Sequence, residues 1–570
     1  MSARKPLLAV LGSCGLSPED CAALAAIVPP NGSTWTNEVL NTGKLDEALF
    51  TTELAKVFNS PTLLVDPADV DRAAVALLPS RFVFKHHVIP VKLDGDTVHI
   101  ATYDVFNQVA RRTATQQLAG RKIVWTLCPR GHLLRAIKRI YGVGAETFEE
   151  LLQTSRTYDS VDDREKAQDI TSDDPEASVV KFVNQVIREA IVERATDIHV
   201  EPLENDLRIR YRIDGMLHEV AVPPQLRVLQ SAIISRLKVM AHMDIAERRL
   251  PQDGRINLTT SAGAIDVRVS TIPTVNGESI SLRLLSRSET LQFGIDRLDM
   301  SPKQVETVQK LLKEPNGIIL VTGPTGSGKS TSLYSFLSSI NAVSRRIITV
   351  EEPVEYRLPG VSQIDVKPEI GLTFANGLRA ILRQDPNIVM VGEIRDFETA
   401  EISIRAAMTG HLVFSTLHTN DAVSGITRLL DMGIEPFLLA SVVRAFLAQR
   451  LVRTLCTQCR EPAHYPLEYL QEIGAPPPPP SGFLRGRGCE NCRHTGYRGR
   501  TAIYEIVNIN ENLRRLIIAK QPGSVLKTRA VADGMDTLRT DGWRRVLHGT
   551  TTIEEVVRVT QLDENLAETD

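Results

Sequence analysis

The sequence predicts an α/β protein whose central domain contains a parallel β-sheet covered by helices on both faces. From about residue 315 onward, short apolar runs alternate with amphipathic segments, which is the order that parallel sheets require. One of these runs, at 318–321, leads through a glycine-rich loop into a helix. Upstream, residues 177–290 contain paired alternating runs joined by turn signals, which predict a separate α+β domain.

Length and composition set the expected number and kind of domains. The chain has 570 residues, and at roughly 150 residues per domain about four domains are expected. Hydrophobic residues make up 42% and charged residues 24%, so most of the chain can form buried cores. The net charge is −3, which argues against a surface dedicated to nucleic-acid binding but allows a local basic groove.

The sequence favours a cytoplasmic location. No stretch reaches the roughly 20 apolar residues that cross a bilayer. The first residues faintly resemble a lipoprotein signal, because the apolar run 7–11 precedes Gly12, Ser13 and Cys14. That run is shorter than the roughly 7–15 residues of a signal core, so we expect no export. Seven cysteines are too few for a disulfide scaffold in a chain of this length.

Changes of composition along the chain indicate seven segments. Residues 143–176 are acidic and nearly free of large apolar side chains, as flexible linkers are. Asp94-Gly95, between two alternating runs, predicts a hairpin in the preceding module. The expected segments are a weakly structured N-terminus (1–35), a small α/β module (36–142), the acidic linker (143–176), the α+β domain (177–290), a nucleotide-binding core (291–445), a cysteine-rich element (446–500) and a helical C-terminal region (501–570).

The stretch GPTGSGKST follows the strand at 318–321 and has the spacing of a phosphate-binding P-loop. Its glycines let backbone N–H groups approach phosphate oxygens, and the N-terminus of the next helix adds partial positive charge. Lys329 is expected to reach the outer phosphates during catalysis, and Ser330 to hold Mg²⁺. The predicted nucleotide-binding residues of this loop are Gly323, Pro324, Thr325, Gly326, Ser327, Gly328, Lys329, Ser330 and Thr331.

Polar side chains follow three other buried strands. VEEPVEY presents Glu351 and Glu352, VGEIRD presents Glu393, and His418 follows the apolar run 412–416. Ligands of open α/β sheets bind at such carboxyl ends. The glutamates are therefore candidate catalytic groups, and His418 is a candidate contact to the γ-phosphate. Taken alone, each glutamate could be a surface residue, and His418 could be a buried histidine with satisfied hydrogen bonds.

The stretch LRIRYRIDG, at 207–215, has arginine at every second position. In a strand, Arg208, Arg210 and Arg212 share one face, and the apolar side chains share the other. The simpler interpretation is a solvated strand face. The alternative is that the row faces an anion, because guanidinium groups stay protonated and bind oxygen atoms bidentately.

Two C-x-x-C pairs lie in the last quarter of the chain. Cys456 with Cys459, and Cys489 with Cys492, are separated by residues 460–488. Two such pairs predict a tetrahedral structural Zn²⁺ site. The gap is longer than in common zinc fingers, and a run of five prolines within it fits an extended excursion. Redox activity is the alternative, although no thioredoxin-like sequence surrounds the pairs.

Four of these stretches, in this order, resemble the motifs of the secretion ATPase superfamily of type II secretion and type IV pilus machines. GPTGSGKST is similar to the Walker A motif, ITVEEPVEY to the Asp box, NIVMVGEIRD to Walker B and GHLVFSTLHTNDA to the His box. The resemblance covers roughly residues 177–565 and implies a RecA-like core preceded by a PAS-like domain. It implies Glu351 as the catalytic glutamate and Glu393 as the Walker B glutamate, whereas Glu352 stands where the family usually has aspartate.

RATDIHVEP and LRIRYRIDG also resemble the domain that precedes the family's motor core. There, strand arginines reach the nucleotide phosphates, which implies catalytic roles for Arg210 and Arg212 and a lesser nucleotide contact for Arg208. The resemblance further implies ATP and Mg²⁺ as ligands and a homohexameric ring. It also implies Zn²⁺ in the tetracysteine element, which assembly-type members commonly carry and retraction-type members typically lack.

The leading interpretation is a cytoplasmic ATPase that powers assembly of a type IV pilus or a type II secretion pseudopilus. The resemblance implies that the N-terminal module docks on inner-membrane platform proteins. Cyclic di-GMP is not expected there, because NTGKLDEALFTTELAKVFNSP lacks the arginine of the R-L-G-x-x-L pattern. The alternatives are pilus retraction, DNA translocation and a nucleotide-binding scaffold with little turnover.

Overall fold

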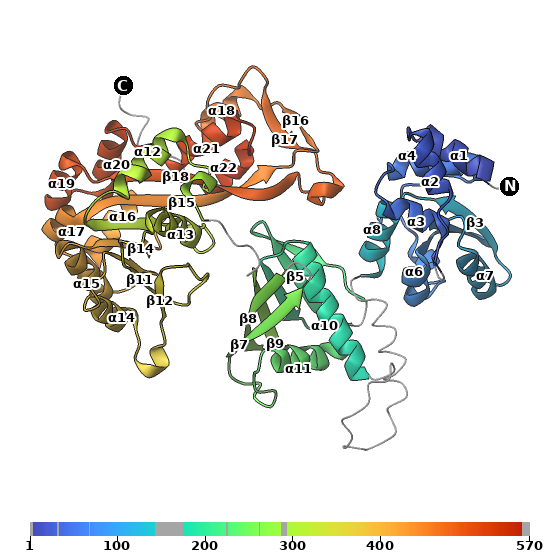
Figure 1. Ribbon diagram of the computed structural model, residues 1–570, viewed down its shortest axis with the longest axis horizontal. Coiled ribbons are helices and arrows are strands. Elements are labelled where there is room, and N and C mark those ends of the chain that lie inside the picture. The colour runs from blue at the N-terminus through green and yellow to red at the C-terminus, as the bar shows by residue number, and fades with distance from the viewer. Residues whose placement is uncertain are drawn as a thin grey trace. The chain divides into compact units, whose positions relative to one another are not determined.

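The computed structural model divides into two compact units, Met1–Ser286 and Arg287–Asp570, which are described separately (Figure 1). The structure describes residues 4–30, 33–67, 69–142, 175–223, 226–260, 263–286 and 293–560. The predicted acidic linker at 143–176 lies outside these described residues except for its last two positions. No helix in the described ranges combines the length and the apolar character that a membrane span needs.

The first part of unit one is a small α/β module around a three-stranded sheet, drawn in blue in Figure 1. β1 (Val88–Asp94) and β2 (Thr97–Thr102) form the hairpin predicted around Asp94-Gly95, and β3 (Lys122–Leu127) pairs parallel to β2. The helices pack on this sheet in a single hydrophobic core. They are α1 (Arg4–Ser13), α2 (Pro18–Ala25), α3 (Trp35–Asn41), α4 (Glu47–Phe58), α5 (Arg72–Val75), α6 (Ser80–His86), α7 (Gln108–Gln117) and α8 (Arg130–Tyr141).

The two helices α1 and α2 differ from the weakly structured N-terminus expected over 1–35. α2 begins after Ser17, whose hydroxyl accepts a hydrogen bond from the backbone N–H of Asp20. Leu11 and Leu24 are buried in the core of the module. Short helices of this kind gain most of their stability from tertiary packing, which a local sequence pattern does not reveal.

The second part of unit one is a six-stranded antiparallel sheet with strand order β6-β5-β4-β9-β8-β7. In β5 (Leu207–Ile213) the predicted alternation holds: the apolar side chains are buried and the arginines lie on the other face. α10 (Pro175–Val192) and α11 (Gln230–Met240) cover the apolar face. The remaining elements are β4 (Asp197–Pro202), β6 (Met216–Val220), η1 (Leu226–Leu229), β7 (Gln252–Thr260), β8 (Gly263–Thr274) and β9 (Gly277–Ser286).

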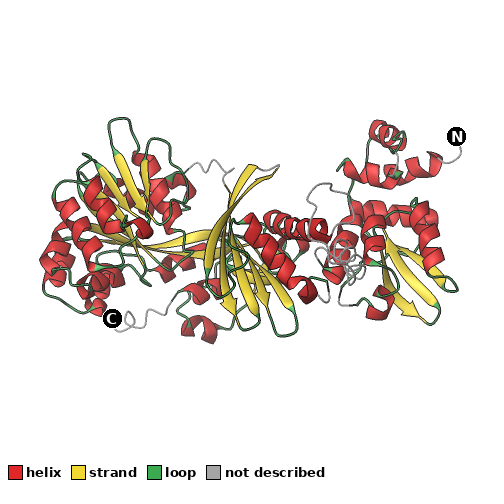
Figure 2. Cartoon of the chain, turned by 90° about the horizontal axis from the view of Figure 1, so that it is seen from below, coloured by secondary structure: helices red, strands yellow, loops and turns green. Residues whose placement is uncertain are grey.

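Unit two is built on a seven-stranded sheet with strand order β12-β11-β13-β14-β10-β15-β18. All pairs are parallel except β15 with β18, which confirms the predicted parallel core. Separate hydrophobic cores lie on the two faces, and helices flank the yellow strands in Figure 2. The strands are β10 (Gly317–Thr322), β11 (Ile347–Glu351), β12 (Ser362–Asp365), β13 (Ile388–Val391), β14 (Leu412–Leu417), β15 (Val443–Leu455) and β18 (Tyr497–Asn508).

The helices of this core connect the strands and cover both faces of the sheet. One face of the sheet has a core that contains Tyr334 and Phe336. The opposite face has a core that contains Leu378 and Ile426. The helices are η2 (Ile295–Arg297), α12 (Pro302–Leu311), α13 (Lys329–Ile340), η3 (Pro368–Ile370), α14 (Phe374–Ile381), α15 (Phe397–Met408), α16 (Val423–Asp431) and α17 (Pro436–Val442).

The C-terminal region expected to be helical over 501–570 begins with a strand, because β18 runs to Asn508. β18 pairs with β15 from Asn508 opposite Ala445 to Tyr497 opposite Leu455, and so extends the sheet. Residues 501–505 of β18 are all buried, so the polar alternation that marks a surface strand is missing. The other elements are β16 (Arg460–Ala463), α18 (Leu467–Glu472), β17 (Phe483–Gly486), η4 (Glu490–Cys492), α19 (Glu511–Ile518), α20 (Gly523–Ala532), α21 (Leu538–Leu547) and α22 (Ile553–Val559).

Candidate functional site

The glycine-rich loop at 323–328 connects the buried strand β10 to helix α13. Gly323, Gly326 and Gly328 have φ angles of 147°, 79° and 89°, which glycine adopts without the strain that other residues incur. A Cβ at Gly323 would lie 2.6 Å from the carbonyl oxygen of Gln449, so no side chain fits there. The exposed residues of the loop and the following helix start are Pro324, Thr325, Gly326, Ser330 and Thr331.

Lys329, the first residue of α13, is folded back onto the loop. Its Nζ donates to the carbonyl oxygens of Gly323 at 2.7 Å and Pro324 at 3.0 Å. Burial lowers the pKa of Lys329 to about 8, helped by the charge of Arg450 and opposed by that of Glu393. The Ser327 hydroxyl is buried and has no hydrogen-bond partner in the described part of the chain. A cation and an unused hydroxyl at a helix N-terminus fit a phosphate ligand.

A cluster of charged side chains lies at the carboxyl ends of the strands beside this loop. Glu393 follows β13, and its Oε2 is 3.1 Å from Nε2 of His418, which follows β14. Arg395 makes a short ion pair with Glu393, and its Nη1 lies 3.3 Å from Oε2 of Glu352, which follows β11. β10 and β13 both pair in parallel with β14, so the P-loop and Glu393 follow strand ends at the same edge of the sheet, and the charge of Glu393 acts on Lys329.

Glu351 is directed elsewhere. It is 5% exposed and accepts hydrogen bonds from Tyr334, from Thr349 at 2.5 Å and from Gln363 at 3.0 Å. Burial raises its pKa, although these hydrogen bonds oppose the shift. The structure therefore brings Glu352, rather than Glu351, into contact with the cluster around Glu393. The assignment of Glu351 as the catalytic glutamate stays a prediction.

Three further residues contact this site and were not singled out in the sequence. Arg395 bridges Glu393 and Glu352. Gln449, in β15, packs against the P-loop, and its Oε1 accepts from the hydroxyl of Ser332 at 2.8 Å. Arg450 donates to the side-chain oxygen of Asn420 at 3.0 Å, and its buried Nε–H has no partner among the described residues. For Gln449 and Arg450, the available signal was the polar pair that interrupts the apolar residues 445–448 and 451–452 of β15.

The arginine row lies in unit one, whereas all the other predicted site residues lie in unit two. Arg208 Nε is 2.9 Å from Oε2 of Glu201, and Arg210 makes a short ion pair with the same carboxylate. Arg212 Nε is 3.7 Å from Oδ2 of Asp197. The three side chains are only 26–36% exposed. Asp197 is shared with Arg283, whose Nε lies 3.0 Å from its Oδ1, and Glu219 of β6 lies opposite Arg210 and acts on it through its charge.

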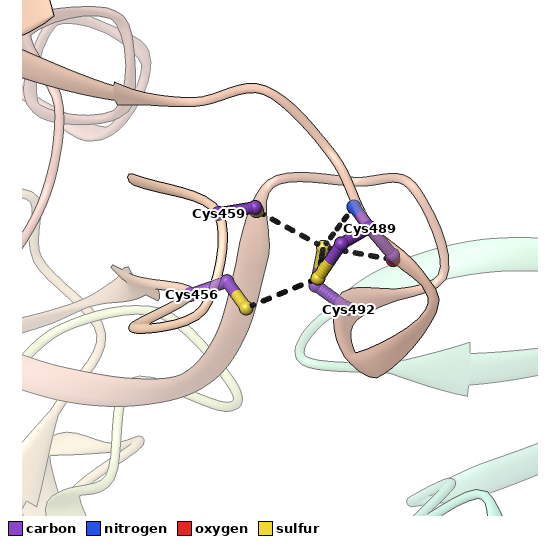
Figure 3. Close-up of side chains that lie close together, drawn as sticks. All are labelled: Cys456, Cys459, Cys489 and Cys492. Atoms are coloured by element: carbon purple, nitrogen blue, oxygen red, sulfur yellow. Dashed lines mark hydrogen bonds between the residues drawn. The ribbon is translucent and has the colours of Figure 1, made fainter. Parts of the chain in front are cut away.

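The four cysteines converge as the spacing predicts (Figure 3). The Sγ separations Cys456–Cys489, Cys459–Cys492 and Cys489–Cys492 are each 3.7 Å, and all four sulfurs lie within 4.8 Å of one another. Zn–S bonds of about 2.3 Å give tetrahedron edges of about 3.8 Å. The donor set therefore fits a four-coordinate zinc ion. No other group of three or more potential ligands of this kind occurs within the described residues.

A phosphate-binding loop at the carboxyl edge of a parallel sheet, with acidic groups and a histidine on the neighbouring strand ends, defines a P-loop nucleoside triphosphatase. Within this class, the chain matches the family described as Type II/IV secretion system protein over residues 172–558. It also matches the MshEN domain over residues 58–147. The chain belongs to the type II/IV secretion system ATPase family and is an enzyme that hydrolyses ATP.

Relatives from both pilus and secretion machines are similar to the chain. The type IV pilus assembly ATPase PilB of Myxococcus xanthus is 42% identical over 545 residues, which cover 94% of each chain. The type II secretion system protein E of Aeromonas hydrophila is 48% identical over 440 residues, which cover 74% of this chain and 87% of the relative. The corresponding protein of Xanthomonas campestris pv. campestris is 44% identical over 519 residues, which cover 89% of each. The family resemblance read from the motifs is thereby confirmed.

Proposed function

We propose that the chain forms a hexameric ATPase at the cytoplasmic face of the inner membrane and powers assembly of a type IV pilus or a type II secretion pseudopilus. The observation that carries this proposal is the match to a pilus assembly ATPase over 94% of both chains. The tetracysteine cluster supports assembly rather than retraction, because the sequence resemblance associates it with assembly-type members. The N-terminal module would dock on inner-membrane platform proteins.

In this proposal, the P-loop backbone and Lys329 bind the ATP phosphates, and Ser330 holds Mg²⁺, which supplies charge neutralisation at the phosphate oxygens. Glu393 is proposed to orient and deprotonate the attacking water, because it stands at the carboxyl end of β13, at the same edge of the sheet as the P-loop, and contacts His418. His418 contacts Glu393 and is proposed to bind the γ-phosphate. Arg395 is proposed to hold Glu393 in position through their ion pair.

Arg210 and Arg212, with Arg208, are proposed to compensate negative charge on the ATP phosphates. Support comes from their position in one row on one strand face and from the sharing of carboxylates, because Glu201 pairs with both Arg208 and Arg210, and Asp197 with both Arg212 and Arg283. Glu201 pairs with Arg208 and Arg210, so a phosphate would either share these guanidinium groups with Glu201 or replace it as their partner. Arginine suits this exchange because it stays charged in either partnership.

Deleting the gene is expected to abolish pilus assembly or type II secretion in the native host. The unmodified chain should restore it, and Glu393→Gln should not, because the proposed role requires ATP turnover rather than nucleotide binding. The measurement is electron microscopy of surface filaments together with export of secreted enzymes.

The same experiment separates the alternatives. Filaments that still assemble but no longer retract would identify a retraction motor and contradict the proposal. Full restoration by Glu393→Gln would instead indicate a scaffold with little turnover. A matched control is Glu398→Gln, because Glu398 is an exposed glutamate that pairs with Arg379 on the surface; this variant should restore the phenotype completely.

Zinc is the metal that we propose for the tetracysteine cluster, and about one ion per freshly purified chain is expected. A Cys489→Ser variant should lose it, because three thiolates and a hydroxyl bind the ion more weakly. A chelator should unfold the region around 456–492 before the P-loop core, since structural zinc contributes directly to folding. Elemental analysis and limited proteolysis measure the two effects.

The control for this experiment is another buried cysteine. Cys21 lies in the N-terminal module, and its thiol donates to the carbonyl oxygen of Leu16. Cys21→Ser should leave the zinc content unchanged. Purified protein without zinc, with the four thiols fully reactive, would rule out the metal site.

A further inference from the structure

The five residues that follow β14, 418–422, form a loop that we call the sensor loop because it begins with His418. Three strands of the core sheet hold this loop. Thr322, at the end of the P-loop strand, donates to the carbonyl oxygen of Asp421 at 3.4 Å. Arg450, in β15, donates to the Asn420 side chain at 3.0 Å. The loop is therefore attached to the nucleotide site at several points.

The third attachment comes from Glu505 in β18. Glu505 is 1% exposed, and its Oε1 accepts from the backbone N–H of Ala422 at 2.9 Å, at the start of α16. Its other oxygen, Oε2, accepts from the backbone N–H of Leu538 at 3.2 Å, in the first turn of α21. One buried carboxylate thus serves two helix N-termini, where unpaired N–H groups and the helix dipole stabilise negative charge.

α21 is in turn connected to the region around the tetracysteine cluster. It packs on α22 in a shared hydrophobic core. Between these two helices, the carbonyl oxygen of Thr550 accepts from the N–H of Leu455, the residue before Cys456. The hydroxyl groups of Thr552 and Tyr497 lie 2.7 Å apart. The ends of β15 and β18 that lie next to the cysteines are therefore hydrogen-bonded to Thr550 and Thr552, which lie between α21 and α22.

We propose that Glu505 is a positioning residue that couples the sensor loop to helix α21, so that nucleotide contact at His418 is transmitted to the C-terminal helices. The inference rests on the proposed catalytic use of the sensor loop. The carboxylate of Glu505 joins the sensor loop, whose His418 contacts Glu393, to helix α21, which packs on α22.

The ionisation of Glu505 gives the coupling a pH dependence. Asp421 and Lys527 are the charged groups that act on it. Burial, with a smaller contribution from Asp421, raises the pKa of Glu505 to about 7, while the two backbone N–H groups and Lys527 oppose the shift. The ionised form accepts both hydrogen bonds fully, and the protonated form gives up an acceptor position to its own proton. The coupling should weaken as pH falls through about 7.

Stability should change in the opposite direction. Because the ordinary pKa of glutamate is 4.5 and that of Glu505 is about 7, the folded chain binds the extra proton between these values. Its contribution to the free energy of unfolding therefore decreases as pH rises through this range, while the coupling strengthens. A purely structural Glu505 would change only the free energy of unfolding with pH. A positioning Glu505 would in addition raise kcat as pH rises through about 7.

The test is Glu505→Gln, which keeps the shape and one acceptor oxygen. At pH 8 we expect kcat to fall about 10-fold to 100-fold, the size expected for a small misplacement of a catalytic group. The decrease in wild-type kcat below pH 7 should shrink in the variant. Binding of a non-hydrolysable ATP analogue should protect the α21 amides from hydrogen exchange in the wild type but not in the variant.

Glu555→Gln is the matched control. Glu555 is equally buried, and its carboxylate accepts from the backbone N–H of Arg453 and from the side chains of Arg453 and Arg558, with no hydrogen bond to the sensor loop among the described residues. It should lose thermal stability and keep kcat, its pH profile and the nucleotide-dependent protection of α21. If Glu505→Gln behaves in the same way, Glu505 is only structural and the proposal fails. If the wild-type chain does not depend on His418 for turnover, the catalytic assignment fails instead, which a His418→Ala variant shows independently.

Discussion

Replacing Glu393 with glutamine is expected to lower kcat by about 100-fold or more and to leave ATP binding intact, as for a group placed at the reacting centre. The substitution removes a charge and a proton acceptor but preserves the size of the side chain. In the structure, this carboxylate is held by Arg395 and His418 and acts on Lys329. Steady-state phosphate release and equilibrium nucleotide binding measure the two quantities.

Parallel variants decide between the three glutamates. Glu352 shares Arg395 with Glu393, whereas Glu351 is enclosed by Tyr334, Thr349 and Gln363. If kcat is unchanged in Glu393→Gln, the catalytic role lies with one of the other two. A larger loss in Glu351→Gln than in Glu352→Gln, without loss of thermal stability, would support the assignment made from the sequence.

Replacing Arg210 with glutamine is expected to depress kcat by about 10³-fold if the residue acts like an arginine finger. The fold should survive, because the side chain lies on the polar face of β5 and the apolar face stays intact. Its Nε–H is buried and lacks a partner among the residues described, so one donor of the guanidinium is still unused. Single-turnover hydrolysis, with enzyme in excess over ATP, measures the effect on the chemical step.

Arg227→Gln is the control for this substitution. Arg227 lies in the same unit and, among the described residues, donates to the backbone carbonyl of Leu203 alone, at 2.8 Å. It should change neither turnover nor, by more than about 0.5 kcal/mol, stability. If Arg210→Gln behaves in the same way, the arginine row is a solvated surface held by Glu201, and the simpler interpretation of LRIRYRIDG is correct.

The parts of the structure that the sequence predicts well are those whose signals are local. The P-loop is recognisable because the loop chemistry at 323–328 and its flanking strand and helix are contiguous in the chain. The same holds for the alternation in β5 and for the convergence of two C-x-x-C pairs. In each case the residues that meet in space are either neighbours in sequence or have few geometric alternatives.

The rest depends on contacts between distant segments. Glu351 and Glu352 are adjacent, so backbone alternation must send them in different directions, but only the packing of α13 decides which one is enclosed by Tyr334. Glu201 lies near Arg208 and Arg210 only because β4 and β5 pair in a particular register. Similarly, Glu505 reaches the sensor loop through the pairing of β15 with β18, which a cysteine-rich insertion separates in sequence.

Strand β15 has a mechanical consequence because a single continuous element runs from the nucleotide site to the cysteines. Gln449 lies against Gly323, and Cys456 directly follows the last residue of the strand. At about 3.3 Å per residue, these two positions lie about 23 Å apart. The ladder with β18 stiffens the strand over this distance. A tilt of β15 by about 10° around Gln449 would move Cys456 by about 4 Å at this rise per residue. A small change of strand direction beside the P-loop would therefore displace the tetracysteine cluster by about the length of a side chain, so β15 can act as a lever arm.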